Sequence, residues 1–322
     1  MILQGKTILL TGGVGSFGSK FVEVVLKKYN PKAIRVFDIN ELKEVEMERK
    51  FQDERLRFFI GDVRDVDRLK MAMRGCDIVV HAAALKHITV CEYNPIEAVK
   101  TNIEGAINIV KAALSEGVER VIALSTDKAV YPVNLYGATK MVMEKIIVQG
   151  NTYAANQNIR FACTRYGNVV ASSGSVIPLF KSQSSTGKIT ITDEHMTRFW
   201  ITLEQGVEFV IKSLQRMQGG EIFVPKIPSM RIIDLAEAIA PNAQKEIIGI
   251  RPGEKLHESL ITAEEAKHAK EYEDYFVIEP EFPFWRADEQ KDGKVLPDGF
   301  QYTSDNNTWW LKKEELRKII DF

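Results

Sequence analysis

Residues 7–18 read TILLTGGVGSFG, a short apolar run that passes directly into a glycine-rich loop. The run Thr7–Thr11 is aliphatic and β-branched, which predicts a buried strand. The stretch from about Ser16 to Lys28 has helical character and follows the loop at once. A strand, a glycine loop and a helix in this order predict the start of a βαβ unit that binds a dinucleotide.

The spacing of the glycines gives this prediction a physical basis. Gly12, Gly15 and Gly18 suit a tight turn, a close approach of the backbone to a pyrophosphate, and close packing of the helix on the sheet. The helix N-terminus would present its free N–H groups and positive dipole end to the phosphates, with Ser16 and Phe17 beside them. A plain tight turn is the alternative interpretation.

Strands and helices alternate through the first 130 residues. Further strands are expected at 33–38, 56–61, 78–81 and 121–124, with helices at 41–52, 66–73, 94–114 and from Tyr136 onward. Such alternation predicts a parallel sheet, and right-handed crossovers favour a Rossmann-type, doubly wound α/β fold. The pattern loosens after residue 151, with loops expected over 171–187 and helices at 203–215, 232–239 and 312–320. We expect a smaller, irregular α/β domain there that binds the substrate.

Composition narrows the class of protein. The chain has 322 residues, which suggests two domains, and 43 Lys+Arg against 44 Asp+Glu leave a net charge of −1. This balance argues against nucleic acid or a membrane surface as a partner. Three scattered cysteines, Cys76, Cys91 and Cys163, form neither a disulfide framework nor a metal-site spacing, so we expect no metal and a cytoplasmic location. No segment is long and apolar enough to predict a transmembrane helix or a signal peptide.

Acidic residues follow the second and third strands. Asp38 stands where a carboxylate can bind the adenosine ribose 2′-hydroxyl and would repel a 2′-phosphate. Asp62 and Val63 are expected to edge the adenine. An exposed turn or helix cap is the alternative for each aspartate.

Polar residues also follow the fifth strand. Ser125, Thr126, Asp127 and Lys128 come directly after it, where ligands bind in open α/β sheets. The motif Tyr136-x-x-x-Lys140 then opens a helix, and residues four apart share one helix face. A nearby ammonium and a cationic nicotinamide would depress the phenol pKa, so we expect Tyr136 to act as a general base.

These motifs together resemble the extended short-chain dehydrogenase/reductases, and specifically the UDP-N-acetylglucosamine 4,6-dehydratases. The resemblance covers nearly the whole chain, and it is closest to the inverting enzymes that open pseudaminic acid synthesis. The stretches that carry it include HAAALKH (81–87), CEYNPIEAVKTNIEG (91–105), STDKAVYPVNLYGATK (125–140), RYGNVV (165–170), GSVIPLF (174–180), MTRFWIT (196–202), GGEIFVPKIPSM (219–230) and RPGEKLHE (251–258).

The resemblance implies a reaction and its residues. Tyr136 would take the proton of the sugar 4-hydroxyl while hydride leaves C4 for a tightly bound NAD(P)+, which is regenerated in each cycle. Lys128, with a pKa lowered by burial, would remove the C5 proton, and Asp127 would protonate the departing C6 hydroxyl. The hydride returns to C6, and protonation on the opposite face inverts C5. Thr126 and Lys140 complete the implied catalytic set.

The resemblance also places the substrate. Residues implied to contact the nucleotide sugar are Lys86, Asn168, Ser175, Val176, Arg198, Arg251 and Glu254, with Ala83 and Lys86 beside the cofactor. Arg198 and Arg251 suit a bidentate contact with the diphosphate or the uracil edge. His81 and His87 are expected to be structural. A surface salt bridge or a helix cap is the alternative for the charged residues.

The resemblance also implies domain boundaries and an oligomeric state. The first domain is predicted to comprise 1–167, with 198–224 returning to it, and the substrate domain 168–197 and 225–322. Relatives are often hexamers, so a homo-oligomer is expected.

Two departures from the family pattern affect these expectations. Asp38-Ile39-Asn40 replaces the usual Ser-Arg-Asp, which predicts that NAD is tolerated or preferred over NADP. Ala171–Gly174 lacks an arginine that these enzymes carry.

Other functions remain open on the sequence alone. A retaining 4,6-dehydratase is one alternative; retaining relatives often carry Met at the position of Tyr136, so Tyr136 favours the inverting branch, although some inverting relatives carry Met there too. A UDP-sugar 4-epimerase would use Tyr136 and Lys140 but would leave Asp127 and Lys128 without a task. A non-catalytic NAD(P)-sensing protein on the same fold usually lacks the tyrosine or the lysine, and both are present here.

Overall fold

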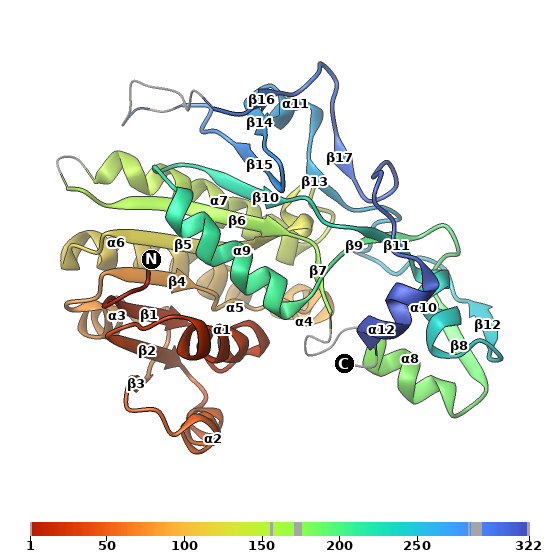
Figure 1. The fold of residues 1–322 in the computed structure, drawn as a ribbon, viewed down its shortest axis with the longest axis horizontal. Helices are drawn as coiled ribbons and strands as arrows, with labels where there is room; N and C mark the ends of the chain where they lie inside the picture. The colour runs from red at the N-terminus through yellow and green to blue at the C-terminus, as the bar shows by residue number, and fades with distance from the viewer. Residues whose placement is uncertain (1, 155–156, 171–175, 283, 285–291, 321–322) are drawn as a thin grey trace.

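The computed structural model of the protein describes residues 2–154, 157–170, 176–282, 284 and 292–320 (Figure 1). The first half alternates strands and helices as β1 (Thr7–Thr11), α1 (Ser16–Lys28), β2 (Ala33–Asp38), α2 (Glu41–Phe51), β3 (Leu56–Ile60), α3 (Val66–Met73), β4 (Ile78–His81), α4 (Ile88–Tyr93), α5 (Pro95–Val99), α6 (Gly105–Glu116), β5 (Arg120–Thr126), α7 (Leu135–Tyr153) and β6 (Arg160–Tyr166). A π-helical turn, η1 (Lys100–Glu104), joins α5 to α6, and a 3₁₀ turn, η2 (Asp127–Ala129), follows β5.

The second half contains more and shorter elements. They are β7 (Asn168–Val169), α8 (Val176–Ser184), β8 (Lys188–Ile191), β9 (Thr197–Ile201), α9 (Leu203–Arg216), β10 (Ile222–Pro225), β11 (Ser229–Arg231), α10 (Ile232–Ile239), β12 (Gln244–Ile247), β13 (Ser259–Ile261), α11 (Ala263–Ala266), β14 (Ala269–Glu271), β15 (Tyr275–Ile278), β16 (Lys294–Val295), β17 (Tyr302–Thr303) and α12 (Lys313–Ile320).

One large sheet organises the molecule. Its order is β16-β14-β15-β10-β6-β5-β4-β1-β2-β3, and the run from β10 to β3 is parallel throughout. The order reverses at β1, so the crevice beyond the carboxyl ends of β1 and β4 is the topological switch point where such folds bind ligands. The predicted Rossmann-type, doubly wound sheet is therefore confirmed.

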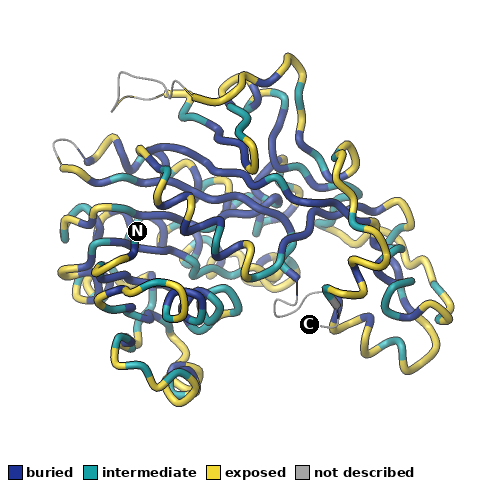
Figure 2. Tube along the Cα trace, viewed as in Figure 1, coloured by how far each residue is buried: buried dark blue, intermediate teal, exposed yellow. Residues whose placement is uncertain are grey.

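Helices cover both faces of this sheet, which explains the continuous apolar strands. Helix α1 packs beside α9, while α6 packs against both α3 and α7. Every residue of β1 is buried, and the blue strands at the centre of Figure 2 contrast with the yellow outer surfaces of the helices.

The C-terminal half contributes both to this sheet and to a second core. Strands β15, β14 and β16 extend the large sheet in antiparallel fashion. A separate hydrophobic cluster joins the β7–β9 region to α8, α10 and α12, and includes Phe180, Trp200 and Leu235. Part of the predicted substrate domain, from Leu260 to Tyr302, thus packs in the first core instead of the second.

The expected loop over 171–187 is wrong in part, because α8 occupies Val176–Ser184. Its apolar face, with Ile177 and Phe180, is buried in the second core, so tertiary packing makes a helix of a short segment with weak local signals. The long helix expected over 94–114 is present but carries the π-turn at 100–104. Within the described residues, no helix is long and apolar enough to cross a membrane.

Candidate active site

The glycine loop has the geometry that a dinucleotide demands. Gly12 has a φ of +66°, and a Cβ added there would lie 2.7 Å from the backbone N of Ala83. A Cβ on Gly18 would lie 2.3 Å from the Gly13 carbonyl oxygen, so the first turn of α1 rests directly on the loop. The loop, the N-terminus of α1 and the end of β4 thus approach closely enough for backbone N–H groups to surround phosphates. The residues present fit NAD(P)+.

A cleft of about 960 Å³ runs from this loop across the carboxyl ends of the strands. Its lining includes the predicted cofactor residues Gly12, Gly15, Ser16, Phe17, Asp38, Asp62, Val63, Ala83, Lys86, Tyr136 and Lys140. It also includes the predicted substrate residues Asn168, Val176, Arg251 and Glu254, and the catalytic candidates Thr126 and Lys128. Gly18 lies behind the lining as a packing residue, and Ser175 lies outside the described residues, as does the 171–174 departure.

The end of the cleft near β2 carries one carboxylate in its lining, that of Asp38. Asp38 accepts hydrogen bonds from the backbone N–H groups of Asn40, at 3.1 Å, and Val14, at 3.3 Å. Glu44 on α2 is buried beside it, and burial, reinforced by the charge of Asp38, raises the pKa of Glu44 to about 7. This arrangement opposes a further negative group at that end.

The carboxyl end of β5 holds a buried chain of polar contacts. Thr126 Oγ1 donates to Asp127 Oδ1 at 2.9 Å, and the same oxygen accepts from Lys128 Nζ at 2.9 Å. Lys128 Nζ also donates to Asn168 Oδ1 at 3.2 Å. Burial raises the pKa of Asp127, and although the charge of Lys128 opposes this effect, the pKa stays above its ordinary value. A raised pKa makes this carboxyl group easier to protonate, and the protonated form is the one that a general acid needs.

The predicted pKa of Lys128 is wrong in direction. Burial lowers the pKa of this amine, but the charges of Asp127 and Glu258 outweigh burial and leave the pKa above its ordinary value. Lys128 is therefore an ammonium in the resting protein, and it can serve as a base only after passing a proton on.

The prediction for Tyr136 also needs correction. Burial raises the pKa of its phenol to about 12, and the charge of Lys128 and a hydrogen bond with Thr126 offset part of this rise. Lys140 does not supply the expected effect. Its own pKa is lowered by burial to about 8, so it can exchange a proton near neutral pH.

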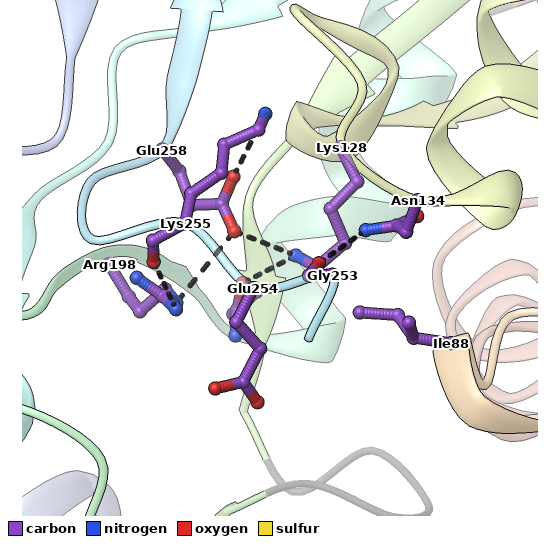
Figure 3. Close-up of a pocket in the computed structure, with 9 residues that line it drawn as sticks. Ile88, Lys128, Asn134, Arg198, Gly253, Glu254, Lys255 and Glu258 are labelled. Carbon is purple, nitrogen blue, oxygen red and sulfur yellow. Dashed lines mark hydrogen bonds and ion pairs between the residues drawn. The ribbon is translucent and has the colours of Figure 1, made fainter. Parts of the chain in front are cut away.

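A smaller pocket of about 120 Å³ adjoins the cleft and is lined by Ile88, Lys128, Asn134, Asn168, Arg198, Gly253, Glu254, Lys255 and Glu258 (Figure 3). Glu258, which the sequence reasoning did not single out, is 2% exposed and lies 3.5 Å from Lys128 Nζ. Its only sequence signal was its place at the end of RPGEKLHE. A glutamate next to a histidine normally reads as a surface residue, and only the fold shows that it is buried.

The guanidinium of Arg198 forms its hydrogen bonds with backbone carbonyl oxygens. Its guanidinium donates to the carbonyl oxygens of Thr197, Leu256 and Lys255 at 2.7–3.0 Å. Arg198 thus holds the 255–258 segment in place, and a bidentate contact with the substrate stays a prediction. Arg251 is exposed on the wall of the larger cleft.

His81 is structural, as expected. It is buried, it shares a 2.8 Å hydrogen bond with Thr11 Oγ1, and burial lowers its pKa to about 3. The imidazole is neutral at any physiological pH and ties β4 to β1.

Known proteins resemble this chain over nearly its full length. A family model described as polysaccharide biosynthesis protein matches residues 8–280. A Campylobacter jejuni protein named UDP-N-acetylglucosamine 4,6-dehydratase (inverting) is 51% identical over 325 residues, which cover 98% of this chain and 97% of that protein. A Rickettsia conorii protein named UDP-glucose 4-epimerase is 40% identical over 328 residues, 98% of this chain and 95% of that one. The X-ray structure of Pen from Bacillus thuringiensis has a TM-score of 0.91 and 38% identity, covering 99% of this chain and 98% of that chain.

Proposed function

The chain belongs to the polysaccharide biosynthesis protein family, and from that premise we propose that it is a UDP-N-acetylglucosamine 4,6-dehydratase that inverts C5. The reaction removes one water from the sugar and gives a UDP-4-keto-6-deoxy-L-arabino-hexosamine. The observation that carries the proposal is the hydrogen bond between Lys128, which lines the pocket next to the cofactor cleft, and Asp127, which is buried directly behind it.

NAD(P)+ is the proposed cofactor, held by the glycine loop, Asp38, the Asp62–Val63 segment and Ala83. When bound, it supplies oxidation at C4 and the matching reduction at C6 by carrying one hydride between them. No external oxidant is consumed, which supports tight, permanent binding. The Asp38 carboxylate in the cleft lining favours NAD over NADP, and binding measurements under equal conditions that gave a strong NADP preference would contradict this.

The chain's own residues move the protons. Tyr136 takes the proton of the 4-hydroxyl after its own phenol proton, which a pKa of about 12 retains at rest, has been passed on; Thr126, which hydrogen-bonds it, orients the phenol. Lys140 exchanges a proton near neutral pH and can relay it from this end of α7. At the next step Lys128 Nζ takes the proton from C5, and the Asp127 carboxyl donates one to the C6 oxygen, which leaves as water. Lys128 then ends as an ammonium and Asp127 as a carboxylate, which is the resting ion pair. As the hydride returns to C6, one proton returns to C5 on the opposite face and balances the proton taken from the 4-hydroxyl.

A 4-epimerase is the second candidate, because a relative at 40% identity carries that name. An epimerase needs a base at the 4-hydroxyl but moves no proton at C5 and no oxygen at C6. The buried Asp127–Lys128 pair would then have no function. Incubation with UDP-N-acetylglucosamine separates the candidates by mass. A dehydratase yields a product lighter by one water without added reductant, an epimerase yields an isomer, and a sensing protein yields nothing.

The stereochemistry is tested in the same sample. Proton NMR of the product formed in D2O reports the configuration at C5 and distinguishes the inverting from the retaining reaction. Inversion is the outcome that would make the product a precursor for pseudaminic acid.

The remaining parts of the proposal concern substrate, assembly and location. Lys86, Asn168, Val176, Arg251 and Glu254 on the cleft wall are the proposed contacts for the nucleotide sugar. A homo-oligomer, with a hexamer as the expected size, is testable by light scattering. The three free, buried cysteines support a reducing, cytoplasmic compartment.

A further inference from the structure

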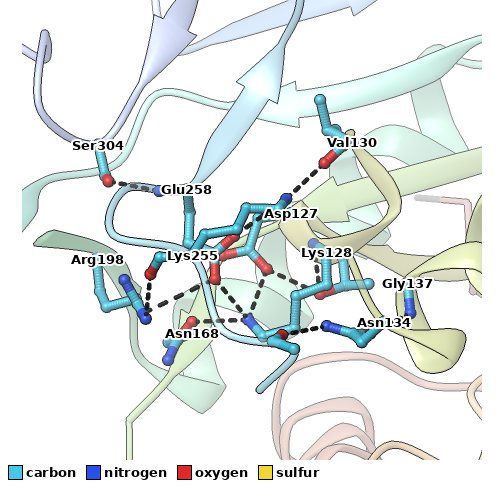
Figure 4. Close-up of polar contacts among 12 residues, drawn as sticks. Asp127, Lys128, Val130, Asn134, Gly137, Asn168, Arg198, Lys255, Glu258 and Ser304 are labelled. Carbon is cyan, nitrogen blue, oxygen red and sulfur yellow. Dashed lines mark hydrogen bonds and ion pairs between the residues drawn. The ribbon is translucent and has the colours of Figure 1, made fainter. Parts of the chain in front are cut away.

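Glu258 reaches the catalytic pair from a distant part of the chain. Its Oε1 lies 3.5 Å from Lys128 Nζ and 3.8 Å from Arg198 Nε, and its Oε2 lies 3.5 Å from Lys255 Nζ (Figure 4). Its side chain is 3% exposed. An unpaired carboxylate this deeply buried would be costly, so its charge is sustained by these cations.

The backbone fixes Glu258 in this position. Its N–H donates to Ser304 Oγ at 2.9 Å, and its carbonyl oxygen accepts from the Ser304 N–H at 2.8 Å. Ser304 Oγ also bonds to Thr197 Oγ1 at 2.6 Å, one residue before Arg198. Three segments that are far apart in sequence therefore lock one carboxylate against Lys128.

The surrounding charges define what this carboxylate does. The titratable and charged groups that face the pair are Tyr136 on α7, Arg198 on β9, and Glu254, Lys255 and Glu258 on the 253–258 segment. Arg198 and Lys255 favour loss of a proton from the pair, whereas Glu258 favours its retention. Glu258 is also the carboxylate outside the pair that lies in ion-pair contact with the Lys128 ammonium.

We propose that Glu258 is a positioning residue that holds the Lys128 ammonium between two carboxylates and keeps one transferable proton on the Asp127–Lys128 pair. This inference rests on the proposed function. The proton moves from Lys128 Nζ to Asp127 Oδ1 along their 2.9 Å hydrogen bond. The N–H bond breaks as the O–H bond forms, so that the ion pair becomes a neutral amine and a neutral carboxylic acid with no change in total charge.

This tautomer has the two groups that dehydration requires. The amine accepts the C5 proton and the acid donates to the C6 oxygen, after which the ion pair has re-formed. If the pair loses its proton to solvent, the amine remains but no acid is left to release water. The negative charge of Glu258 raises the pKa of both Asp127 and Lys128, so it opposes that loss.

The test uses Glu258→Gln in the full chain, since the amide keeps the shape and removes the charge. Removing a charge at this distance is expected to lower the Lys128 pKa by roughly 1–3 units. The rate of labelling of Lys128 by an amine-reactive reagent at one mildly alkaline pH should then rise by roughly 10- to 1000-fold, because labelling follows the neutral amine. Peptide mass spectrometry reads this rate without any turnover.

Glu265→Gln is the matched control. Glu265 also ion-pairs with a buried arginine, Arg165, at 2.8 Å, and caps α11, where glutamine at the same position preserves the capping box. In the Glu265→Gln variant, Lys128 should be labelled at the same rate as in the wild type. Equal labelling in Glu258→Gln and the wild type, or an equal rise in both variants, would overturn the inference. If Glu258→Gln does not fold, Glu258→Asp, which keeps the charge at greater distance, should give a smaller rise, and no rise would again overturn it.

A second readout links the labelling to the reaction. In Glu258→Gln, the alkaline limb of the kcat–pH profile for water loss should move toward neutral pH by as many pH units as the Lys128 pKa falls. In Glu258→Asp, the limb should move by a smaller amount. A limb that stays in place would count against the proton-retaining role. If labelling shifts as expected but the wild type releases no water from UDP-N-acetylglucosamine, then the proposed function fails while the assigned role of Glu258 in Lys128 protonation stands.

Discussion

A methyl group added to Gly12 should disrupt the cofactor loop far more than the same change at another left-handed glycine. Gly12 and Gly117 have nearly equal φ angles, +66° and +69°. Alanine in this region costs about 1–2 kcal/mol at either position. At Gly117, which ends α6, an added Cβ has no atom within 4 Å, whereas at Gly12 it would lie 2.7–2.9 Å from the backbone of Ala82 and Ala83.

Comparing the stability of Gly12→Ala with that of Gly117→Ala isolates the cost of the close contact between Gly12 and the backbone of residues 82–83. Backbone of β4 cannot move away without disturbing the sheet, so the overlap at Gly12 should add about 1–3 kcal/mol. We expect Gly117→Ala to lose about 1–2 kcal/mol of unfolding free energy and Gly12→Ala about 2–5 kcal/mol in urea titrations, the sums of these two contributions. Isothermal titration should show weaker NAD binding for Gly12→Ala alone. Equal losses in both variants would refute the close-packed loop.

Three further outcomes test individual side chains. Lys128→Ala should abolish water loss while nucleotide remains on the gel-filtered protein, because Lys128 lies apart from the glycine loop; unchanged turnover would remove it as the base. Tyr136→Phe should slow single-turnover oxidation at C4 by about 10²-fold or more, the usual size of acid–base effects, and wild-type rates would exclude the phenol. Glu44 has a folded pKa of about 7, above its ordinary 4.5, so the folded state holds a proton that the unfolded chain has lost between these pH values. Wild-type stability should therefore fall by roughly 2–3 kcal/mol relative to Glu44→Gln as the pH rises from below 4.5 to 8, and parallel stability curves would contradict this.

The Rossmann half of the fold was predictable because each element carries its own signal. The strands that end at Thr11 and His81 are buried on both faces, so their sequences are continuous apolar runs that stop where the strand stops. The site residues that follow these strand ends were found for the same reason. Topology brings the carboxyl ends of parallel strands together, whatever the intervening sequence.

Features that depend on distant packing were not predictable. The helix α8 forms because its apolar face finds the second core, and β14 and β15 join the large sheet from a stretch that reads as irregular. The predicted pKa shifts of Lys128 and Tyr136 were wrong for a similar reason. The pKa of Lys128 depends on burial, on its neighbour Asp127 and on Glu258, which no spacing rule connects with it, and the pKa of Tyr136 depends first on burial. A local motif identifies a titratable group, but its surroundings decide when it holds a proton.

The choice between dehydratase and epimerase therefore depends on a few contacts, and the fold leaves it open. Both kinds of enzyme need the glycine loop and the Tyr136–Lys140 turn, and relatives with both names align with nearly all of this chain. The elimination alone needs an acid and a base within one hydrogen bond of each other. Asp127 and Lys128 meet that condition with a hydrogen bond of 2.9 Å. Glu258 comes from a segment much later in the chain, and we propose that it keeps one transferable proton on the pair. A variant that neutralises Glu258 while leaving cofactor binding intact would thus separate the chemistry of water loss from the oxidation that both enzymes share.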